Sequence, residues 1–131
     1  MSSDLNNGQH SLTVLNPGDV TLWSNEFRDL CDTLDSSRIG SLVESCHSGN
    51  FADDMIGGGY LAMATSDEAY LSWQTANGGI FTNQFFNAIE SGSNAIDAFS
   101  VAETHVLSKS APYYRQYPKL CDESIHDFFG N

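Results

Sequence analysis

The residues best suited to chemistry form one short stretch, residues 44–49, Glu-Ser-Cys-His-Ser-Gly. An apolar run, residues 39–43, precedes it, and such a run ending in turn-forming residues is typical of a buried strand. In open α/β sheets, ligands bind at the carboxyl ends of the strands. Cys46 is therefore a candidate nucleophile on a strand-to-loop corner. The alternative is a small buried hydrophobic residue without a chemical role.

A cysteine nucleophile requires a thiolate, a nearby base and hydrogen-bond donors for the developing oxyanion. Gly49 would let backbone N–H groups approach a carbonyl oxygen. His47 is adjacent to Cys46, but successive side chains of an extended strand point to opposite faces, so we expect it to be a poor base. The base is then expected from elsewhere in the chain. A hydrolase or acyltransferase using Ser48 is a further alternative, disfavoured because the sequence has no Gly-x-Ser-x-Gly elbow.

Hydrophobic patterns indicate an α/β fold around this corner. Strands are expected at residues 12–15, 39–45 and 60–65, and helices at residues 24–34, 82–90 and 94–109. The order strand, helix, strand at the start implies that strands 12–15 and 39–45 pair in parallel through a right-handed crossover. Thr82 and Asn94 are the expected N-caps of the last two helices. The tail after Pro112 is expected to be irregular.

The composition bounds the size and the partners of the protein. Its 131 residues are enough for a single domain with one core. The 17 acidic residues outnumber 5 Lys and Arg, giving a formal net charge of −12, and only Arg28 and Arg38 are basic before residue 109. Such a surface repels nucleic acid and anionic lipid and attracts a basic polypeptide. The alternative is that the acidity serves only solubility.

Targeting and metal signals are weak throughout. No stretch is long and apolar enough to span a membrane, and the first ten residues lack the features of a signal peptide, which slightly favours a cytoplasmic location. The three cysteines, Cys31, Cys46 and Cys121, form neither a disulfide framework nor a zinc-binding pair. Cys31 falls on the apolar face of a predicted helix and is expected in the core. We expect no metal and no cofactor.

Residues 44–49 resemble the catalytic cysteine motif of caspase-like cysteine peptidases, the group of legumains, metacaspases and clostripain-like enzymes. Those sequences place an acidic residue two positions before the cysteine and continue with Cys-His-Ser-Gly or Cys-Glu-Ser-Gly. Further segments are similar to the family in the same order: residues 51–54, 64–68, 72–73, 78–82 and 117–122. The resemblance covers about residues 39–122, and the ordered set is more specific than the hexapeptide alone.

The resemblance implies a three-layer α/β/α sandwich with a mostly parallel sheet, and a cysteine endopeptidase activity. Cys46 would be the nucleophile, and its backbone N–H would help to form the oxyanion hole. Glu44 would line the pocket for the side chain before the cut (P1), and the substrate-binding residues would also include Ser66, Asp67 and Trp73. An anionic wall suits a basic P1 side chain, or an Asn as in the legumain-like branch.

The chain departs from the family at the catalytic histidine. In the family this residue precedes the cysteine in a short His-Gly motif, by about 50 residues in caspases. The best local match to that motif, residues 3–6, has Leu5 in place of the histidine. His10 is the only histidine upstream of Cys46 and is therefore the candidate base. His105 and His126 lie downstream, outside the position that the family uses.

The family's first strands are also absent from the recognised pattern, so we expect an open sheet edge. Association through this edge with a second copy or a complementary chain is the expected consequence. Two functions follow from these residues. The first is an active peptidase acting on polypeptide substrates. The second is a catalytically inactive caspase-like module that binds peptides or protein partners at the same cleft.

Overall fold

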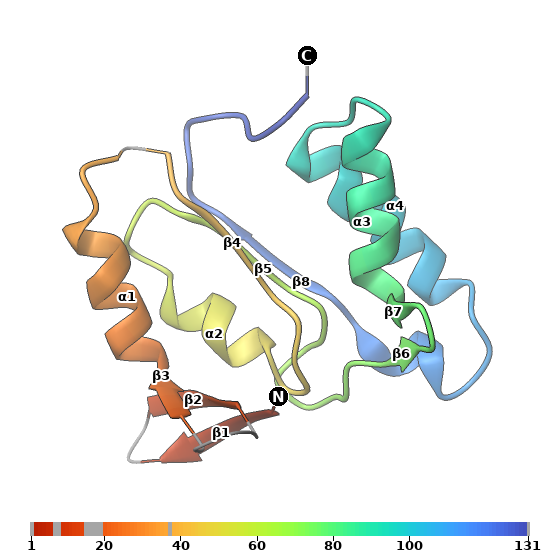
Figure 1. Cartoon of the computed structure of the whole chain (residues 1–131), viewed down its shortest axis with the longest axis horizontal. Coiled ribbons are helices and arrows are strands. Elements are labelled where there is room, and N and C mark those ends of the chain that lie inside the picture. Colours follow the sequence, from red (N-terminus) through yellow and green to blue (C-terminus); the bar gives the residue numbers. More distant parts are fainter. Residues whose placement is uncertain (1, 7–8, 15–19, 37, 131) are drawn as a thin grey trace.

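The computed structural model describes residues 2–6, 9–14, 20–36 and 38–130, with side chains from residue 22 onward. The chain is a small α/β protein (Figure 1). Its strands are β1 (Ser2–Asn6), β2 (Gln9–Val14), β3 (Val20–Trp23), β4 (Gly40–Val43), β5 (Leu61–Ala64), β6 (Gln74–Thr75), β7 (Gly78–Gly79) and β8 (Lys119–Asp122). Its helices are α1 (Ser24–Thr33), α2 (Gly49–Asp54), α3 (Ile80–Glu90), α4 (Ala95–Leu107) and the 3₁₀ turn η1 (Tyr113–Gln116).

The central sheet is mixed and open, with strand order β4-β5-β8. Strands β4 and β5 run parallel, with Gly40 beside Leu61 and Val43 beside Ala64. Strand β8 runs antiparallel to β5. The two strands predicted at residues 39–45 and 60–65 are confirmed, whereas the expectation of an irregular tail is wrong at β8. This strand is short, with two apolar residues between charged ends, and it owes its conformation to its pairing with β5.

Alternation along β5 divides the apolar interior between the two faces of the sheet. Leu61 and Met63 pack with α3 and α4, whereas Ala62 and Ala64 pack on the side of α1 and α2. Figure 1 shows the sheet between these two pairs of helices. The larger cluster is rich in phenylalanine and the smaller one contains Cys31, which is buried as predicted.

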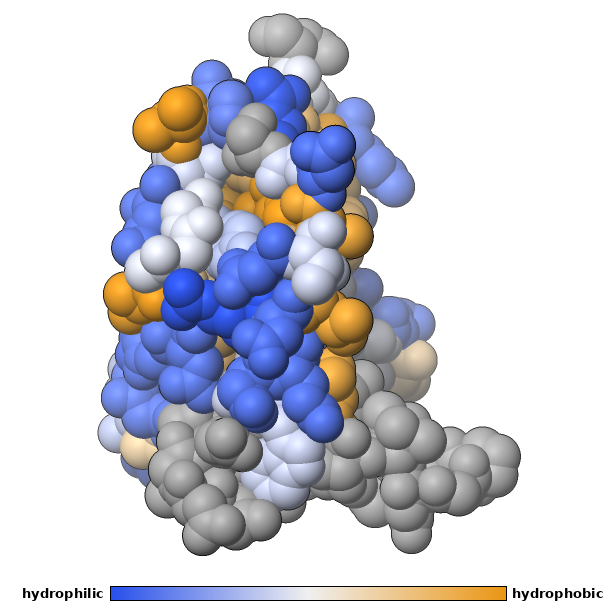
Figure 2. All heavy atoms as spheres, turned by 90° about the vertical axis from the view of Figure 1, so that its left-hand side faces the viewer, coloured by the Kyte–Doolittle hydropathy of each residue, from blue (hydrophilic) through white to orange (hydrophobic). Residues whose placement is uncertain are grey.

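The outward surface on the α1 side is largely hydrophilic, with apolar residues at its margins (Figure 2). Helix α1 carries exposed acidic residues, including Asp29 and Asp32. Its helical pattern matches the prediction closely, and Glu26 accepts a hydrogen bond from the backbone N–H of Trp23 at 3.1 Å. Within the described residues, no helix is long and apolar enough to cross a membrane.

The N-terminal strands depart from the predicted topology. Strand β2 contains residues 12–14 of the predicted strand, and Leu15 lies outside the described residues. It pairs antiparallel with β1 and β3 in a separate three-stranded sheet. The predicted parallel pairing of strands 12–15 and 39–45 is therefore wrong. Short connections favour antiparallel neighbours over a crossover, and β1, β2 and β3 follow one another closely along the chain.

Of the two N-caps predicted for the last two helices, the structure confirms one. The Asn94 side chain accepts a hydrogen bond from the Asp97 N–H at 2.9 Å, which confirms the cap of α4. The predicted cap at Thr82 is wrong, because α3 begins at Ile80 with Gly79 as its N-cap. Strand β7 leads directly into the helix, so Thr82 lies within the first turn of α3. Its hydroxyl is buried without a hydrogen-bond partner among the described residues.

Candidate functional site

Cys46 lies on the corner that joins β4 to α2. Strand β4 ends at Val43, and the next helix begins at Gly49. Ser45 and Ser48 are buried, whereas Cys46 and His47 are only half-buried. His47 has a positive φ of 59°, a conformation that turns the chain sharply between strand and helix. The corner therefore presents the Cys46 sulfur at the carboxyl end of a parallel strand, as the sequence predicted.

A buried serine web holds this corner against the end of β5. The Ser66 hydroxyl donates to the Ser45 carbonyl at 2.9 Å, and the Ser48 N–H donates to the Ser66 hydroxyl at 3.3 Å. The Ser66 N–H donates in turn to the Ser48 hydroxyl at 3.2 Å. Ser48 and Ser66 are fully buried. A buried, hydrogen-bonded Ser48 cannot meet a substrate, which removes the support for a serine hydrolase.

Gly49 permits a close approach of two loops. A Cβ at this position would lie 2.8 Å from the backbone nitrogen of Glu68 and 3.0 Å from the carbonyl carbon of Asp67. Real Cβ atoms do not come this close to backbone, so a side chain here would push the loop away. Glycine at the end of the cysteine motif is thus explained by packing against residues 67–68.

An open hollow of about 340 Å³ lies beside Cys46. Its lining residues are Glu44, Ser45, Cys46, Ser72, Trp73 and Gln74. The Cys46 sulfur lies 3.8 Å from the Ser72 carbonyl oxygen, and the Ser72 hydroxyl is 2.7 Å from the Thr65 hydroxyl. The Trp73 ring packs edge-on against Tyr113 with 5.6 Å between centroids. These contacts give the hollow one wall from the β4 corner and another from residues 72–74.

Of the described residues that line the hollow, Glu44 is the one that carries a charge. Its carboxylate lies against Gly79, so closely that a Cβ on that glycine would overlap it. Gly79 is the N-cap of α3, and the N-terminus of a helix favours a neighbouring negative charge. Glu44 thus lines the hollow, its predicted role in binding the P1 side chain stays a prediction, and the sequence pattern contains no signal for its contact with Gly79.

The other predicted substrate-binding residues lie in different surroundings. Trp73 lines the hollow, but neither Ser66 nor Asp67 does. Ser66 is buried beneath the corner, and its hydroxyl positions Ser45 and Ser48. Asp67 is half-buried, and its carboxylate accepts a hydrogen bond from the Glu68 N–H at 2.6 Å. Both residues shape the loop that follows β5, and neither contacts the space beside the sulfur.

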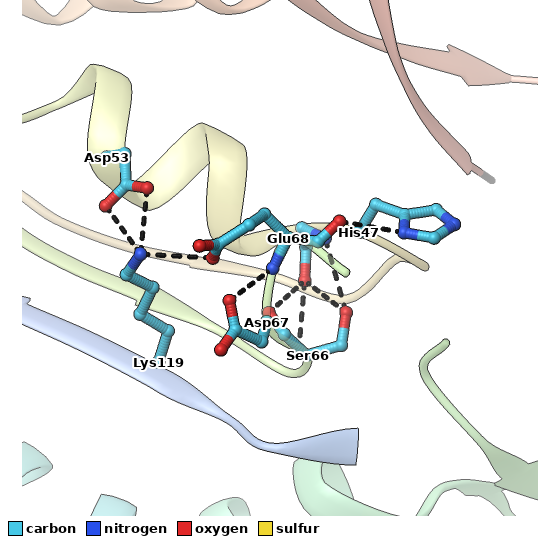
Figure 3. A network of polar contacts seen from close by, with 7 residues as sticks. His47, Asp53, Ser66, Asp67, Glu68 and Lys119 are labelled. Atoms are coloured by element: carbon cyan, nitrogen blue, oxygen red, sulfur yellow. Dashed lines mark hydrogen bonds and ion pairs between the residues drawn. The ribbon is translucent and has the colours of Figure 1, made fainter. Parts of the chain in front are cut away.

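His47 is turned toward the same loop (Figure 3). Its Nδ1 lies 2.9 Å from the Glu68 carbonyl oxygen, and its backbone N–H donates to the Tyr70 carbonyl at 2.9 Å. A carbonyl only accepts, so Nδ1 carries the proton. This hydrogen bond fixes the ring tautomer and leaves Nε2 as its acceptor, so the expectation that His47 is a poor base for Cys46 stays a prediction.

An ion-pair network ties the corner to β8 (Figure 3). The Lys119 ammonium lies 2.8 Å from the Asp53 carboxylate on α2 and 3.2 Å from the Glu68 carboxylate. Burial lowers the pKa of Lys119, but its hydrogen bonds to the two carboxylates outweigh that effect and raise it. The network thus joins α2, β8 and the loop after β5. The sequence pattern gave no signal for it, because its members lie far apart in the chain.

His10, the predicted base, lies on β2 opposite Leu5 on β1. Its side chain falls outside the described part of the chain. The sheet that carries it contacts α1 and α2, and Figure 1 shows it at the end of the molecule toward which β4 runs. The roles of His10 and of the Cys46 N–H remain predictions. In residues 22–36 and 38–130, no group of acidic, cysteine and histidine side chains has the arrangement of a metal site.

Comparison with known proteins adds no family to this description. No protein-family model, curated protein or solved structure matches the chain.

Proposed function

We propose that this chain is a caspase-like cysteine peptidase domain with Cys46 as its nucleophile. The supporting observation is the setting of the sulfur: half-exposed, at the carboxyl end of a parallel strand, beside an open hollow with a single acidic lining residue, Glu44. Active sites of open α/β sheets occupy this position. A structural cysteine would be enclosed by apolar side chains, as Cys31 is.

The proposed architecture is the three-layer α/β/α sandwich of that family. Helices on both faces of the β4-β5-β8 sheet are consistent with it. The parallel pair β4 and β5 would correspond to the strand that carries the cysteine and the strand that follows it. The antiparallel β8 makes this sheet mixed, which limits the agreement with a mostly parallel sheet.

In the proposed reaction, the Cys46 thiolate attacks the peptide carbonyl carbon and forms a carbon–sulfur bond. The carbonyl oxygen becomes an oxyanion that accepts a hydrogen bond from the Cys46 N–H. The carbon–nitrogen bond then breaks, and an imidazolium, proposed to be that of His10, gives its proton to the leaving amine. Water attacks the resulting thioester, which releases the acid and restores the thiol.

The proposed specificity is for a basic P1 side chain. Glu44 supplies the negative charge of the hollow, and no basic residue lines it among the described side chains. A caspase-like preference for Asp would place two carboxylates together without a cation, which is unfavourable. Asn, an uncharged donor, is the second residue that suits this wall.

A peptide-binding module without catalysis is the second candidate. One observation favours it: within the described side chains, the Cys46 sulfur has the Ser72 carbonyl as its polar neighbour, and no imidazole nitrogen bonds to it. The same hollow would then hold a peptide without cleaving it. Reactivity of the thiol separates the two candidates.

The test is the rate at which Cys46 is alkylated by iodoacetamide, read by mass spectrometry of peptides between pH 5 and 9. Cys31 and Cys121 are poor references, because burial is the main factor that raises their pKa and slows them. A small free thiol with a pKa of about 8.5 is the better reference. A peptidase should show alkylation of Cys46 that exceeds the free thiol at pH 6 and that is lost in Cys46→Ala.

Matched histidine variants complete the test. His10→Ala should reduce the rate at pH 6 at least tenfold, whereas His126→Ala, a histidine of the tail, should not change it. Cys46 that alkylates no faster than the free thiol at every pH would refute the peptidase and leave the binding module. A rate that falls equally in both histidine variants would remove His10 from the mechanism.

A further inference from the structure

Among the residues that the structure describes, no strand pairs with one edge of β4. Its other edge pairs with β5, where the carbonyls of Ile39 and Val43 accept hydrogen bonds from the N–H groups of Leu61 and Thr65, each at 3.1 Å. Backbone groups of successive residues point to opposite sides of a strand. The N–H and C=O of Gly40 therefore point to the free edge, as do those of the residue two positions on. An edge of this kind is a template for another strand.

An apolar hollow of about 490 Å³ lies beside this edge. The large apolar side chains that line it are Leu42, Met63, Phe85, Phe86, Phe128 and Phe129. Gly40 lets the Phe128 ring lie close against the strand, because a Cβ there would come within 3.1 Å of that ring. Phe86 and Phe129 are exposed, 47% and 60% respectively, so the hollow is edged by apolar surface that water now covers.

The strand and its flanks are complementary to themselves. Residues 38–44 read Arg-Ile-Gly-Ser-Leu-Val-Glu. When this segment pairs antiparallel with a second copy about Ser41, Arg38 stands opposite Glu44. In the same register Ile39 faces Val43, and Gly40 faces Leu42. One register therefore pairs opposite charges, pairs two apolar side chains, and places a small residue opposite a large one.

We propose that two copies of this chain associate through their β4 edges, antiparallel about a two-fold axis at Ser41. The β4-β5-β8 sheets of the two copies then form one continuous sheet. Leu42 of the partner subunit enters the apolar hollow opposite Gly40, and the two residues exchange backbone hydrogen bonds because both point to the free edge. The contact is isologous, so each favourable pair occurs twice.

The charge beside the apolar hollow favours the β4 strand of a second copy over a basic peptide. Arg38 is the one charged residue among the described residues that line the apolar hollow, and it is exposed. A basic segment would be repelled there, whereas the copy of this strand brings Glu44 of the partner subunit to it. Glu44 would serve the edge and the hollow beside Cys46, so a basic substrate side chain and the partner subunit's Arg38 would compete for it.

Analytical ultracentrifugation at about 0.15 M salt tests the proposal, because this salt screens repulsion between the acidic surfaces. The parent chain should sediment as a dimer that dissociates on dilution. Arg38→Glu and Glu44→Arg each place like charges opposite one another twice, so each should weaken the dimer about tenfold or more. The double variant R38E/E44R restores both pairs and should recover the parent affinity.

Two variants match these changes in net charge elsewhere on the surface: Arg115→Glu and Glu90→Arg, both at exposed positions. Both should leave the dimer unchanged. A parent chain of monomer mass up to hundreds of micromolar would overturn the proposal. So would a double variant as weak as the single ones.

Cross-linking tests the register. In S41C the two engineered thiols lie directly opposite in a non-hydrogen-bonded pair, with Cα atoms about 4.5 Å apart, within reach of a disulfide. Mild oxidation should give a dimer on a non-reducing gel that neither the parent nor V43C gives, because Val43 faces Ile39 of the partner subunit. Equal cross-linking of V43C and S41C would overturn the assigned register.

Discussion

The side-chain carbonyl of Gln116 accepts a hydrogen bond from the backbone N–H of Trp73 at 3.1 Å. Its own backbone carbonyl accepts another from the N–H of Asp67 at 3.0 Å. Gln116 is fully buried, and its side-chain Nε2 has no hydrogen-bond partner among the described residues. One residue of η1 therefore holds both ends of the loop that supplies the second wall of the hollow beside Cys46.

Replacing Gln116 should loosen that loop. Gln116→Met keeps the length of the side chain and removes the acceptor, which leaves the Trp73 N–H unpaired. We expect the free energy of unfolding in urea to fall by about 1–3 kcal/mol. We also expect the alkylation rate of Cys46 to change, because Ser72 and Trp73 move with the loop.

Gln74→Met, at an exposed position of the same hollow, is the control and should alter the free energy of unfolding by less than about 0.5 kcal/mol. Equal effects of the two variants would show that the buried hydrogen bond does not hold the loop.

The sequence predicts the elements whose pattern is local. Residues 24–34 and 94–109 have helical apolar spacing, and both helices are present at nearly those bounds. Residues 39–45 and 60–65 are short apolar runs between turn formers, and both contain a parallel strand. The Cys46 corner follows from the same logic, because the end of a buried strand is the place where polar residues meet a ligand.

Long-range pairing is what the pattern could not supply. Residues 119–122, Lys-Leu-Cys-Asp, form a strand only because β5 offers them an edge. Residues 12–14 looked like part of a crossover unit, but hairpin pairing with β1 and β3 decides their position. Gln116 and the Glu44–Gly79 contact likewise depend on segments that are distant in sequence. Secondary-structure propensity is a property of each segment by itself, so it does not predict which distant segments pair.

Tyr60 should make stability sensitive to alkaline pH. Its hydroxyl donates to the Asp32 carboxylate, and this hydrogen bond, with burial, raises the pKa of Tyr60 from 10.0 to about 12. The neutral phenol is favoured by folding, so its contribution is complete below pH 10 and is lost as pH rises toward 12. Tyr60→Phe should cost about 1 kcal/mol at pH 8, and the difference from the parent should shrink by pH 11.

Urea unfolding of both proteins at pH 8 and 11 gives this difference directly. Tyr117→Phe, at an exposed tyrosine, is the matched control and should leave both values unchanged. A difference between parent and Tyr60→Phe that stays constant from pH 8 to 11 would show that the pKa of Tyr60 is not raised by folding.

Lys119 should govern part of the acid sensitivity. The pKa of Glu68 is lowered, chiefly by a hydrogen bond from its own backbone N–H and further by Lys119, which together outweigh the opposing effect of burial. A lowered carboxyl pKa stabilises the fold above the ordinary value of 4.5, and this contribution is lost as pH falls. Lys119→Met should cost about 0.5–1 kcal/mol at pH 7, the range for partly exposed pairs.

The cost of Lys119→Met should diminish as pH falls toward 3, because protonation of Glu68 removes a charge that pairs with Lys119. Urea unfolding at pH 7, 5 and 3 measures the trend. Lys109→Met, at an exposed lysine at the end of α4, should show no comparable loss at pH 7. A cost that is the same at all three pH values would assign the effect to packing of the lysine stem and not to its charge.

Glu44 should set the preference for the residue before the cut. Its carboxylate is the one charge among the residues that line the hollow, so Glu44→Gln removes the attraction to a basic P1 side chain while keeping the shape. The predicted loss for an Arg peptide is about tenfold in kcat/KM, since charge-assisted hydrogen bonds are worth about 1.5–3 kcal/mol where they are buried and less on an open wall. Matched peptides with Arg, Asn and Asp at P1 measure this loss.

In the parent we expect the Arg peptide to be preferred to the Asp peptide, and in Glu44→Gln their kcat/KM values should approach each other. If the chain binds without cleaving, the same ratio appears in the Kd values of the peptides for Cys46→Ala. The same preference for Arg over Asp in the parent and in Glu44→Gln would show that Glu44 does not determine the preferred P1 charge.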